Sequence, residues 1–246
     1  MLRTTAARHV VKVKDYDHLC VTAAQKILEI SKDKITEQGR CSVVLSGGLT
    51  PQGLYASMAA AYRDQLDWKR IHFFMLDERC VSTDSPRSNY KMIELSGMPT
   101  INVHRIKTDV EDPRKAAELY EREIKDFFNL ETGELPHFDL VLLGLGEDGH
   151  VASLFPGHPA LKEKDSFVVA VKAAKVPEKR VTLTLSVINN AAQVIFLVSG
   201  PSKAGILKKV LLEERQSFPA AHVHPSHGEL WWFIDQMAAS LLRRRF

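Results

Sequence analysis

The sequence predicts a single α/β domain over residues 1–246, with a largely parallel sheet flanked by helices on both faces in a doubly wound, Rossmann-like arrangement. Short apolar runs alternate with longer helix-forming stretches, which is the pattern of βαβ units and a parallel sheet. Several of the apolar runs end in polar loops that contain glycine. No low-complexity segment, convincing repeat or long linker divides the chain.

The expected elements follow one another along the whole sequence. Strands are expected at residues 9–13, 42–45, 71–76, 103–106, 138–143, 168–171, 181–185, 193–198 and 231–234. Helices are expected at residues 17–38, 51–61, 89–95, 113–129, from 150 to before 156, from about 201 to 212, and at the end of the chain. The apolar runs justify the strands, because a buried parallel strand reads as a continuous apolar segment.

Capping and helix-breaking residues justify the helix boundaries in chain order. Gly39 suits the left-handed position after the first helix. Pro51 suits the first turn of the second helix, and Ser88 is an N-cap candidate for the third. Pro113 begins a strongly amphipathic fourth helix, and Pro156 ends the short fifth one. These signals place the helices between the strands, as a doubly wound fold requires.

The composition is that of an ordinary globular protein, 45% hydrophobic and 26% charged over 246 residues. A net charge of +3 gives no argument for nucleic acid, but it suits an anionic small molecule. No run of about 18 apolar residues predicts a membrane span. The dispersed Cys20, Cys41 and Cys80 favour a reducing, cytoplasmic location. The basic stretch before His9 leaves a short organelle transit sequence as an alternative.

Four apolar strands are each followed by a polar loop that contains glycine or charge, after residues 45, 76, 143 and 198. Because the carboxyl ends of parallel strands meet at one edge of the sheet, all four loops are expected to share one crevice. The sequence therefore predicts a single site built from segments that are distant along the chain.

The loop after the second strand has the pattern of a phosphate cradle. Gly47 and Gly48 allow the backbone to approach an anion closely, and a helix N-terminus offers free N–H groups. Ser46 and Thr50 add hydroxyl donors. The alternative is an ordinary strand-to-helix turn in which Thr50 is the N-cap.

Two cations are candidates for binding the same anion. Lys203 is expected in the first turn of a helix, where the helix dipole disfavours a cation unless an anion is bound. Arg180 begins a strand and has the forked geometry for a phosphate contact. The alternative for each is an ordinary surface residue.

Charged and amide side chains after the third strand are further candidates. Asp77 and Arg79 directly follow that strand, and Asn89 opens the next helix. Arg79 is expected to stabilise an anionic or polarised substrate oxygen. The alternative is that Asp77 or Glu78 pairs with Arg79 as a structural clamp.

His150 and Asp148 are the candidate proton-transfer pair. Histidine changes charge near neutrality and is the usual general base. Residues two apart do not face each other on a helix, so a direct contact needs a turn, which Gly149 permits. Asp148 as a cap of the short helix near His150 is the alternative.

No metal site is expected. His222, His224 and His227 have spacings that match no regular ligand pattern. The basic tail at residues 243–245 is interpreted as a solvated terminus, with binding or targeting as the alternative.

At these residues the chain resembles the 6-phosphogluconolactonases of the glucosamine-6-phosphate isomerase/6-phosphogluconolactonase superfamily. The matching segments are Ser-Gly-Gly-Leu-Thr-Pro at 46–51, Asp-Glu-Arg at 77–79, Ser-Asn-Tyr at 88–90, the block at 144–157, Arg-Val-Thr-Leu-Thr at 180–184, and Ser199, Gly200 and Lys203. They occur in the family's order, and the block around His150 is the specific one.

The resemblance implies hydrolysis of 6-phospho-D-glucono-1,5-lactone to 6-phospho-D-gluconate in the oxidative pentose phosphate pathway, with no cofactor or metal. It implies phosphate binding near Ser46, Gly47, Gly48, Arg180 and Lys203. His150 would be the general base, Asp148 its partner, and Arg79 the oxyanion contact. The expected partner is this phosphorylated sugar lactone, with no nucleic acid or membrane, for a monomer or weak homo-oligomer.

The same resemblance leaves two alternatives. Glucosamine-6-phosphate deaminases carry a glutamate at the position of Phe155 and typically an aromatic residue at that of Arg79, so both positions favour the hydrolase. A non-catalytic sugar-phosphate sensor usually carries an appended DNA-binding helix pair, and no basic helix-turn-helix precedes His9.

Overall fold

The computed structural model describes residues 7–172, 178–213 and 216–242. The tail at residues 243–245 therefore lies outside the described residues. The strands are β1 (Arg8–Val13), β2 (Cys41–Leu45), β3 (Ile71–Met75), β4 (Asp77–Arg79), β5 (Val103–His104), β6 (Leu140–Leu143), β7 (Val168–Val171), β8 (Arg180–Leu183), β9 (Gln193–Val198) and β10 (Glu229–Asp235). The α-helices are α1 (Tyr16–Gln38), α2 (Leu49–Ala61), α3 (Asn89–Leu95), α4 (Pro113–Phe128), α5 (Leu185–Ile188) and α6 (Ala204–Leu211).

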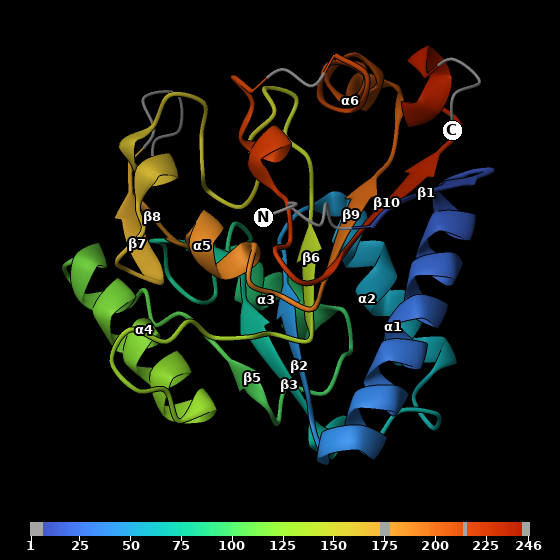
Figure 1. The fold of residues 1–246 in the computed structure, drawn as a ribbon. Coiled ribbons are helices and arrows are strands. Elements are labelled where there is room, and N and C mark those ends of the chain that lie inside the picture. Colours follow the sequence, from blue (N-terminus) through green and yellow to red (C-terminus); the bar gives the residue numbers. More distant parts are fainter. Residues whose placement is uncertain (1–6, 173–177, 214–215, 243–246) are drawn as a thin grey trace.

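The main sheet confirms the predicted fold class. Within the described ranges it has seven strands in the order β1-β10-β9-β6-β2-β3-β5, and every neighbouring pair is parallel. The arrowheads of β6, β9 and β10 point towards the upper part of Figure 1. The loops that leave these carboxyl ends are thus gathered at one edge.

The strand order reverses next to β2, and this reversal creates a crevice. From β1 through β2 and β3 to β5 the chain moves in one direction across the sheet, and from β5 to β6, β9 and β10 it moves back. Because parallel crossovers are right-handed, the two directions place their helices on opposite faces. The loops after β2 and β6 therefore diverge at a topological switch point, where ligands bind in this class of fold.

The strands expected at 168–171 and 181–185 are present but do not join the main sheet. β7 and β8 pair antiparallel with each other, and β8 also pairs antiparallel with the short β4. The result is a separate three-stranded sheet in the order β4-β8-β7, which lies beside α4 in Figure 1. The largely parallel sheet that the sequence predicts does not include these two strands, because a short polar segment after β3 provides an antiparallel pairing edge for β8.

Several helix boundaries differ from those expected. The helix expected from His150 is absent, and Val151 instead forms an isolated antiparallel bridge with Leu154. α2 begins at Leu49, two residues before Pro51, and Gly48 rather than Thr50 is its N-cap. A 3₁₀ turn precedes α6, and the expected terminal helix is a 3₁₀ turn at Ala238–Leu241. Gly39 and Ser88 cap α1 and α3 as predicted.

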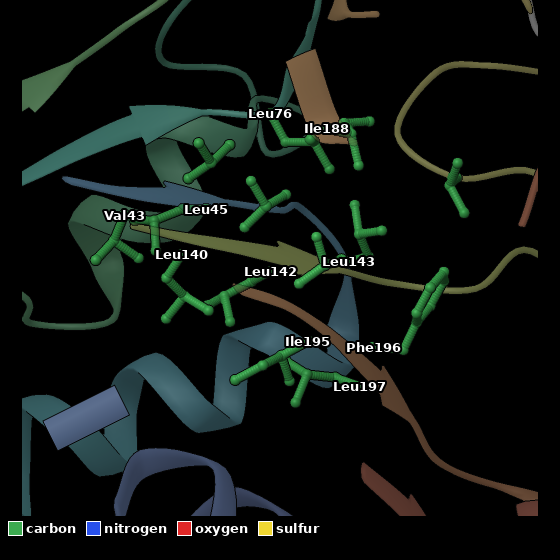
Figure 2. Packing of buried hydrophobic residues seen from close by; sticks show 14 of the residues in the cluster. Val43, Leu45, Leu76, Leu140, Leu142, Leu143, Ile188, Ile195, Phe196 and Leu197 are labelled. Atoms are coloured by element: carbon green, nitrogen blue, oxygen red, sulfur yellow. The ribbon is translucent and has the colours of Figure 1, made fainter. Parts of the chain in front are cut away.

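Buried apolar side chains of the central strands hold the sheet against its helices. All residues of β2 and β6 are buried, including Ser42. Figure 2 shows Val43, Leu142 and Ile195 from three neighbouring strands among the side chains of this cluster. Residues of the second sheet, such as Val181 and Leu183, belong to the same cluster. The described part of the chain contains no helix both long and apolar enough to cross a bilayer.

Two buried polar side chains fix strand ends, one at the edge of the sheet that carries the crevice and one at the opposite edge. The Tyr120 hydroxyl on α4 accepts a hydrogen bond from the Met75 N–H at 2.7 Å and donates to the Met75 carbonyl at 3.0 Å, at the end of β3. At the opposite edge, Asp139 accepts hydrogen bonds from the backbone N–H and hydroxyl of Ser42, both at 2.8 Å. These contacts satisfy polar groups that burial would otherwise leave unpaired.

We predict that Leu142→Ala lowers the free energy of unfolding by about 2–5 kcal/mol, because Leu142 is fully buried and its removal leaves a cavity. Urea denaturation monitored by circular dichroism measures the change. The matched control is Leu95→Ala on α3, where the side chain is 71% exposed. Equal losses for the two variants would contradict the placement of β6 at the centre of the core.

Candidate active site

A cavity of about 700 Å³ lies at the carboxyl ends of β2, β3, β6 and β9. All of the predicted site residues except Asp148 line it: His150, Arg79, Ser46, Gly47, Gly48, Thr50, Asp77, Asn89, Arg180 and Lys203. The structure therefore brings together the four loops that the sequence predicted to converge. Tyr16, Glu147 and Ser202 also line the cavity and were not among the predicted residues.

The loop after β2 brings the N-terminus of α2 into the cavity. Gly48 has a φ of +111° and no side-chain cap, so the first N–H groups of the helix lack a side-chain partner at this position. A Cβ atom on Gly47 would lie only 1.9 Å from the Asn89 side-chain oxygen. Glycine at 47 is thus required by the close approach of Asn89, and the helix end presents donors and a partial positive charge.

Two hydroxyl groups accompany this helix end. The Ser46 hydroxyl is buried and has no hydrogen-bond partner in the described residues. The Tyr16 hydroxyl accepts from the Gly53 N–H at 3.1 Å and contacts the carbonyls of Leu49 and Thr50 at 3.1 and 3.0 Å. Burial raises the pKa of Tyr16 to about 12, so it stays neutral. Tyr16 holds the first turn of α2, while Ser46 has a free hydroxyl beside it.

His150 and Asp148 contact each other directly. The His150 Nδ1 lies 2.5 Å from the Asp148 carboxylate, which also accepts from the His150 backbone N–H at 3.2 Å. The tight turn depends on Gly149, whose φ is +82°, and on Gly146, where a Cβ would lie 2.1 Å from the His150 ring. Asp148 therefore does not cap a helix.

This contact determines what the imidazole can do. A carboxylate at Nδ1 favours the tautomer with the proton on Nδ1, which leaves an electron pair on Nε2. The His150 side chain is 31% exposed and lines the cavity. Burial acts to raise the pKa of Asp148, but hydrogen bonding and the charge of His150 outweigh it, and the pKa is lowered. The carboxylate thus stays ionised and orients a basic nitrogen.

Arg79 and Arg180 are direct partners across the antiparallel β4 and β8 pair. The Arg79 guanidinium donates to the Arg87 carbonyl at 3.2 Å and to the Asn89 side-chain oxygen. Arg180 places its guanidinium 5.7 Å from the Phe155 ring, and its Nε is buried without a partner in the described residues. Burial lowers the pKa of Arg180, with Asp77 opposing the effect. A half-buried guanidinium with a free donor is suited to an anionic ligand.

The two acids after β3 have different roles, and neither clamps the Arg79 guanidinium. The Glu78 carboxylate is 2% exposed and accepts from the backbone N–H groups of Arg79, Asn89 and Tyr90, each at 2.8 Å. Burial nevertheless raises its pKa. It fixes the start of α3, while Asp77 lines the cavity and accepts from the Asn89 amide at 3.2 Å.

Lys203 enters the cavity from the loop after β9. It is the residue before α6 and lies 4.0 Å from the Glu147 carboxylate across the loop after β6. Asp235, at 3% exposure, accepts from the Ser199 hydroxyl at 2.5 Å and from the Gly200 N–H. This buried carboxylate holds the loop that positions Lys203.

Together these groups can bind an anion and move a proton within one cavity. The α2 N-terminus, Arg180 and Lys203 provide positive potential, and His150 Nε2 is a base backed by a carboxylate. The described residues contain no group of three or more histidine, cysteine or acidic side chains that could hold a metal ion. The arrangement is suited to general-base attack of water on a substrate with an anionic group.

Comparison with known proteins gives a consistent result. The family model described as glucosamine-6-phosphate isomerases/6-phosphogluconolactonase matches residues 14–232. The chain is 43% identical to a 6-phosphogluconolactonase of Synechocystis sp. over 216 residues, covering 85% of this chain and 88% of that protein. It is 37% identical over 247 residues to a probable 6-phosphogluconolactonase 1 of Arabidopsis thaliana, covering 94% and 92%.

A solved structure supports the same relationship. The 6-phosphogluconolactonase from Trypanosoma brucei superposes with a TM-score of 0.85 at 30% identity. The match covers 97% of this chain and 100% of that chain.

We predict that His150→Ala raises the pKa of the Asp148 carboxyl, because burial remains while the hydrogen bond and the charge of His150 are lost. Carbon NMR of the carboxyl group during a pH titration measures it. In the wild type the lowered pKa means that the pair's contribution to stability is complete above the ordinary aspartate pKa. That contribution is lost as the pH falls through the lowered value.

The matched control for this titration is His227→Ala, which removes an exposed imidazole. Its Asp148 carboxyl should titrate as in the wild type. An Asp148 pKa that is the same in the His150→Ala variant and the wild type would contradict the direct contact.

Proposed function

The chain belongs to the family of glucosamine-6-phosphate isomerases and 6-phosphogluconolactonases, and we propose that it hydrolyses 6-phospho-D-glucono-1,5-lactone to 6-phospho-D-gluconate with His150 as the general base. The protein is thus an enzyme of the oxidative pentose phosphate pathway. Named 6-phosphogluconolactonases at 37–43% identity over most of the chain support this reaction.

One observation carries the assignment of roles. A single cavity is lined by the carboxylate-backed His150 and by the cationic groups of three other loops. A ligand in this cavity can contact the base and the cations at the same time. The α2 N-terminus, Ser46, Arg180 and Lys203 bind the phosphate in our proposal.

The reaction follows from these positions. His150 Nε2 removes a proton from water, whose oxygen adds to the C1 carbonyl of the lactone. Arg79 stabilises the oxyanion that forms at C1. The bond between C1 and the ring oxygen then breaks, and the protonated His150 returns the proton to that oxygen. Asp148 stays ionised throughout and holds the imidazole in the required tautomer.

The deaminase alternative is less well supported by the site. Ring opening and aldose–ketose isomerisation need additional proton carriers. The Phe155 ring lies 4.9 Å from the His150 ring and cannot transfer a proton. A lactone needs only an activated water and stabilisation of the oxyanion, which the site offers.

The wider setting of the enzyme is part of the proposal. A phosphorylated sugar lactone is its small-molecule partner, and residues 1–246 act as one domain. A cytoplasmic location and a monomeric or weakly oligomeric state are proposed with it. Free Cys20, Cys41 and Cys80 support a reducing compartment.

A coupled assay with freshly generated 6-phosphogluconolactone tests the function. Because such lactones also hydrolyse spontaneously, the rate without enzyme is subtracted. Glucosamine 6-phosphate is supplied in a parallel reaction that detects ammonia. Accelerated lactone hydrolysis without ammonia supports the proposal, and ammonia release without lactonase activity would overturn it.

We predict that His150→Ala lowers kcat by about 10²–10⁴-fold with little change in KM, because it removes the general base and leaves the phosphate contacts intact. Steady-state kinetics in the coupled assay measures both constants. His227→Ala is the matched control and should keep wild-type kinetics. Retention of wild-type kcat by His150→Ala would remove the base assignment.

The pH dependence of the wild-type enzyme is a companion check. Activity should fall on acidification, because a protonated imidazole cannot accept the water proton. The lowered pKa of Asp148 keeps that carboxylate ionised over the same range. A rate that stays constant from about pH 5 to 8 is incompatible with an imidazole base.

We predict that Lys203→Ala raises KM by about tenfold or more with a smaller effect on kcat, because it removes a charge-assisted phosphate contact remote from the reacting carbonyl. The matched control is Lys209→Ala, which removes an exposed lysine of α6, the helix that follows Lys203. A kcat loss with unchanged KM would place Lys203 at the reacting end instead.

A further inference from the structure

The buried hydroxyl of Ser153 links the two arginines of the site, although Ser153 itself does not line the cavity. Its exposure is 0%, and it lies in the tight turn three residues after His150. Neither the phosphate cradle nor the proposed chemistry uses it. Its contacts indicate what it does.

Ser153 contacts three residues of two strands, β4 and β8. Its hydroxyl donates to the Asp77 carboxylate at 2.5 Å, and its backbone N–H donates to the Thr182 hydroxyl at 3.2 Å. The Arg180 guanidinium approaches the same Ser153 hydroxyl oxygen at 3.5 Å, a long hydrogen bond. A hydroxyl has one proton and two acceptor positions, so it can serve both charged groups together.

The hydroxyl bridges two charges that do not pair directly. Between Asp77 and Arg180 the described structure has no ion pair within 4 Å, although the Asp77 charge acts to raise the pKa of Arg180. The series of hydrogen bonds continues from Asp77 to Arg79. The Asp77 carboxylate accepts from the Asn89 amide, and the Asn89 side-chain oxygen accepts from the Arg79 guanidinium. A continuous path thus connects Arg180, Ser153, Asp77, Asn89 and Arg79.

The backbone beside Ser153 adds an independent observation. Ala152 has a φ of +53°, a left-handed conformation that residues with a Cβ seldom adopt. Such conformations persist where surrounding contacts enforce them. Ala152 lines the cavity between His150 and Ser153. The Leu154 N–H closes this turn by donating to the Val151 carbonyl at 2.9 Å, and the bonds from Ser153 to Asp77 and Thr182 attach the turn to β4 and β8.

We propose that Ser153 is a positioning residue, which acts through Arg180 to place its guanidinium for the anionic group of the substrate. The proposal rests on the proposed lactonase function. Asp77 fixes the hydroxyl, and the hydroxyl presents its oxygen to Arg180. Without it, the half-buried guanidinium loses its side-chain hydrogen-bond acceptor and turns from the cavity.

The first test is the kinetics of Ser153→Ala against a matched control. Ser42→Ala is that control, because Ser42 also donates to a buried aspartate, Asp139, at the opposite edge of the sheet. Ser153→Ala should raise KM about tenfold and keep kcat within about threefold. Ser42→Ala should lose thermal stability with wild-type KM. A KM change below twofold in Ser153→Ala, or an equal change in both variants, overturns the proposal.

A double-mutant cycle shows whether Ser153 acts through Arg180. The KM of Ser153→Ala/Arg180→Ala should equal that of Arg180→Ala alone, because without the Arg180 guanidinium the Ser153 hydroxyl has no group to position. Effects that multiply would overturn the proposal. If Ser153→Ala does not fold, Ser153→Cys replaces it with the same expectations, since a thiol of similar size is a weak donor and acceptor. A wild-type enzyme without lactonase activity would refute the proposed function instead.

Discussion

The parallel pairing of two fully buried strands, β2 and β6, is the constraint on which the whole site depends. Val43 pairs with Leu140 and Val44 with Val141, so both strands leave the sheet at the same edge. The segment after β2 continues into α2 on one face of the sheet, and the segment after β6 turns towards the opposite face. The free N-terminus of α2 and the imidazole of His150 share a cavity because β2 and β6 are neighbours in the sheet. The sequence of either loop alone does not show that the two loops meet.

Most of the main sheet was predictable, because its strands are short apolar runs and its helices are marked by residues such as Gly39 and Ser88. The second sheet was not. Arg79 belongs to a polar segment without strand propensity, and it is extended because β8 pairs with it, which is a tertiary effect. The helix expected from His150 was wrong because the left-handed Gly149 and the Asp148 carboxylate stabilise a turn there.

The predicted cavity residues were found because each lies in a loop directly after a strand or at the start of the following element. The parallel sheet gathers the loops after β2, β6 and β9, and the antiparallel pairing of β4 with β8 positions Asp77, Arg79 and Arg180. Direct contact between Asp148 and His150 was left open by the sequence, since it depends on a turn that Gly149 permits but does not require. Tyr16 and Ser153 were missed because their partners lie far away along the chain. Ser153 is part of the segment that carries the resemblance, but nothing local indicates that its hydroxyl faces Asp77.

In the proposed complex, the cations and the base contact opposite ends of the same ligand. A crystal structure of the protein with 6-phospho-D-gluconate tests it most directly, through the position of each end of the bound product. We expect the phosphate beside Lys203 and the N-terminus of α2, with the C1 carboxylate within about 3.2 Å of His150 Nε2. A product bound in the reverse direction, or a His150 ring with Nε2 turned out of the cavity, would contradict it.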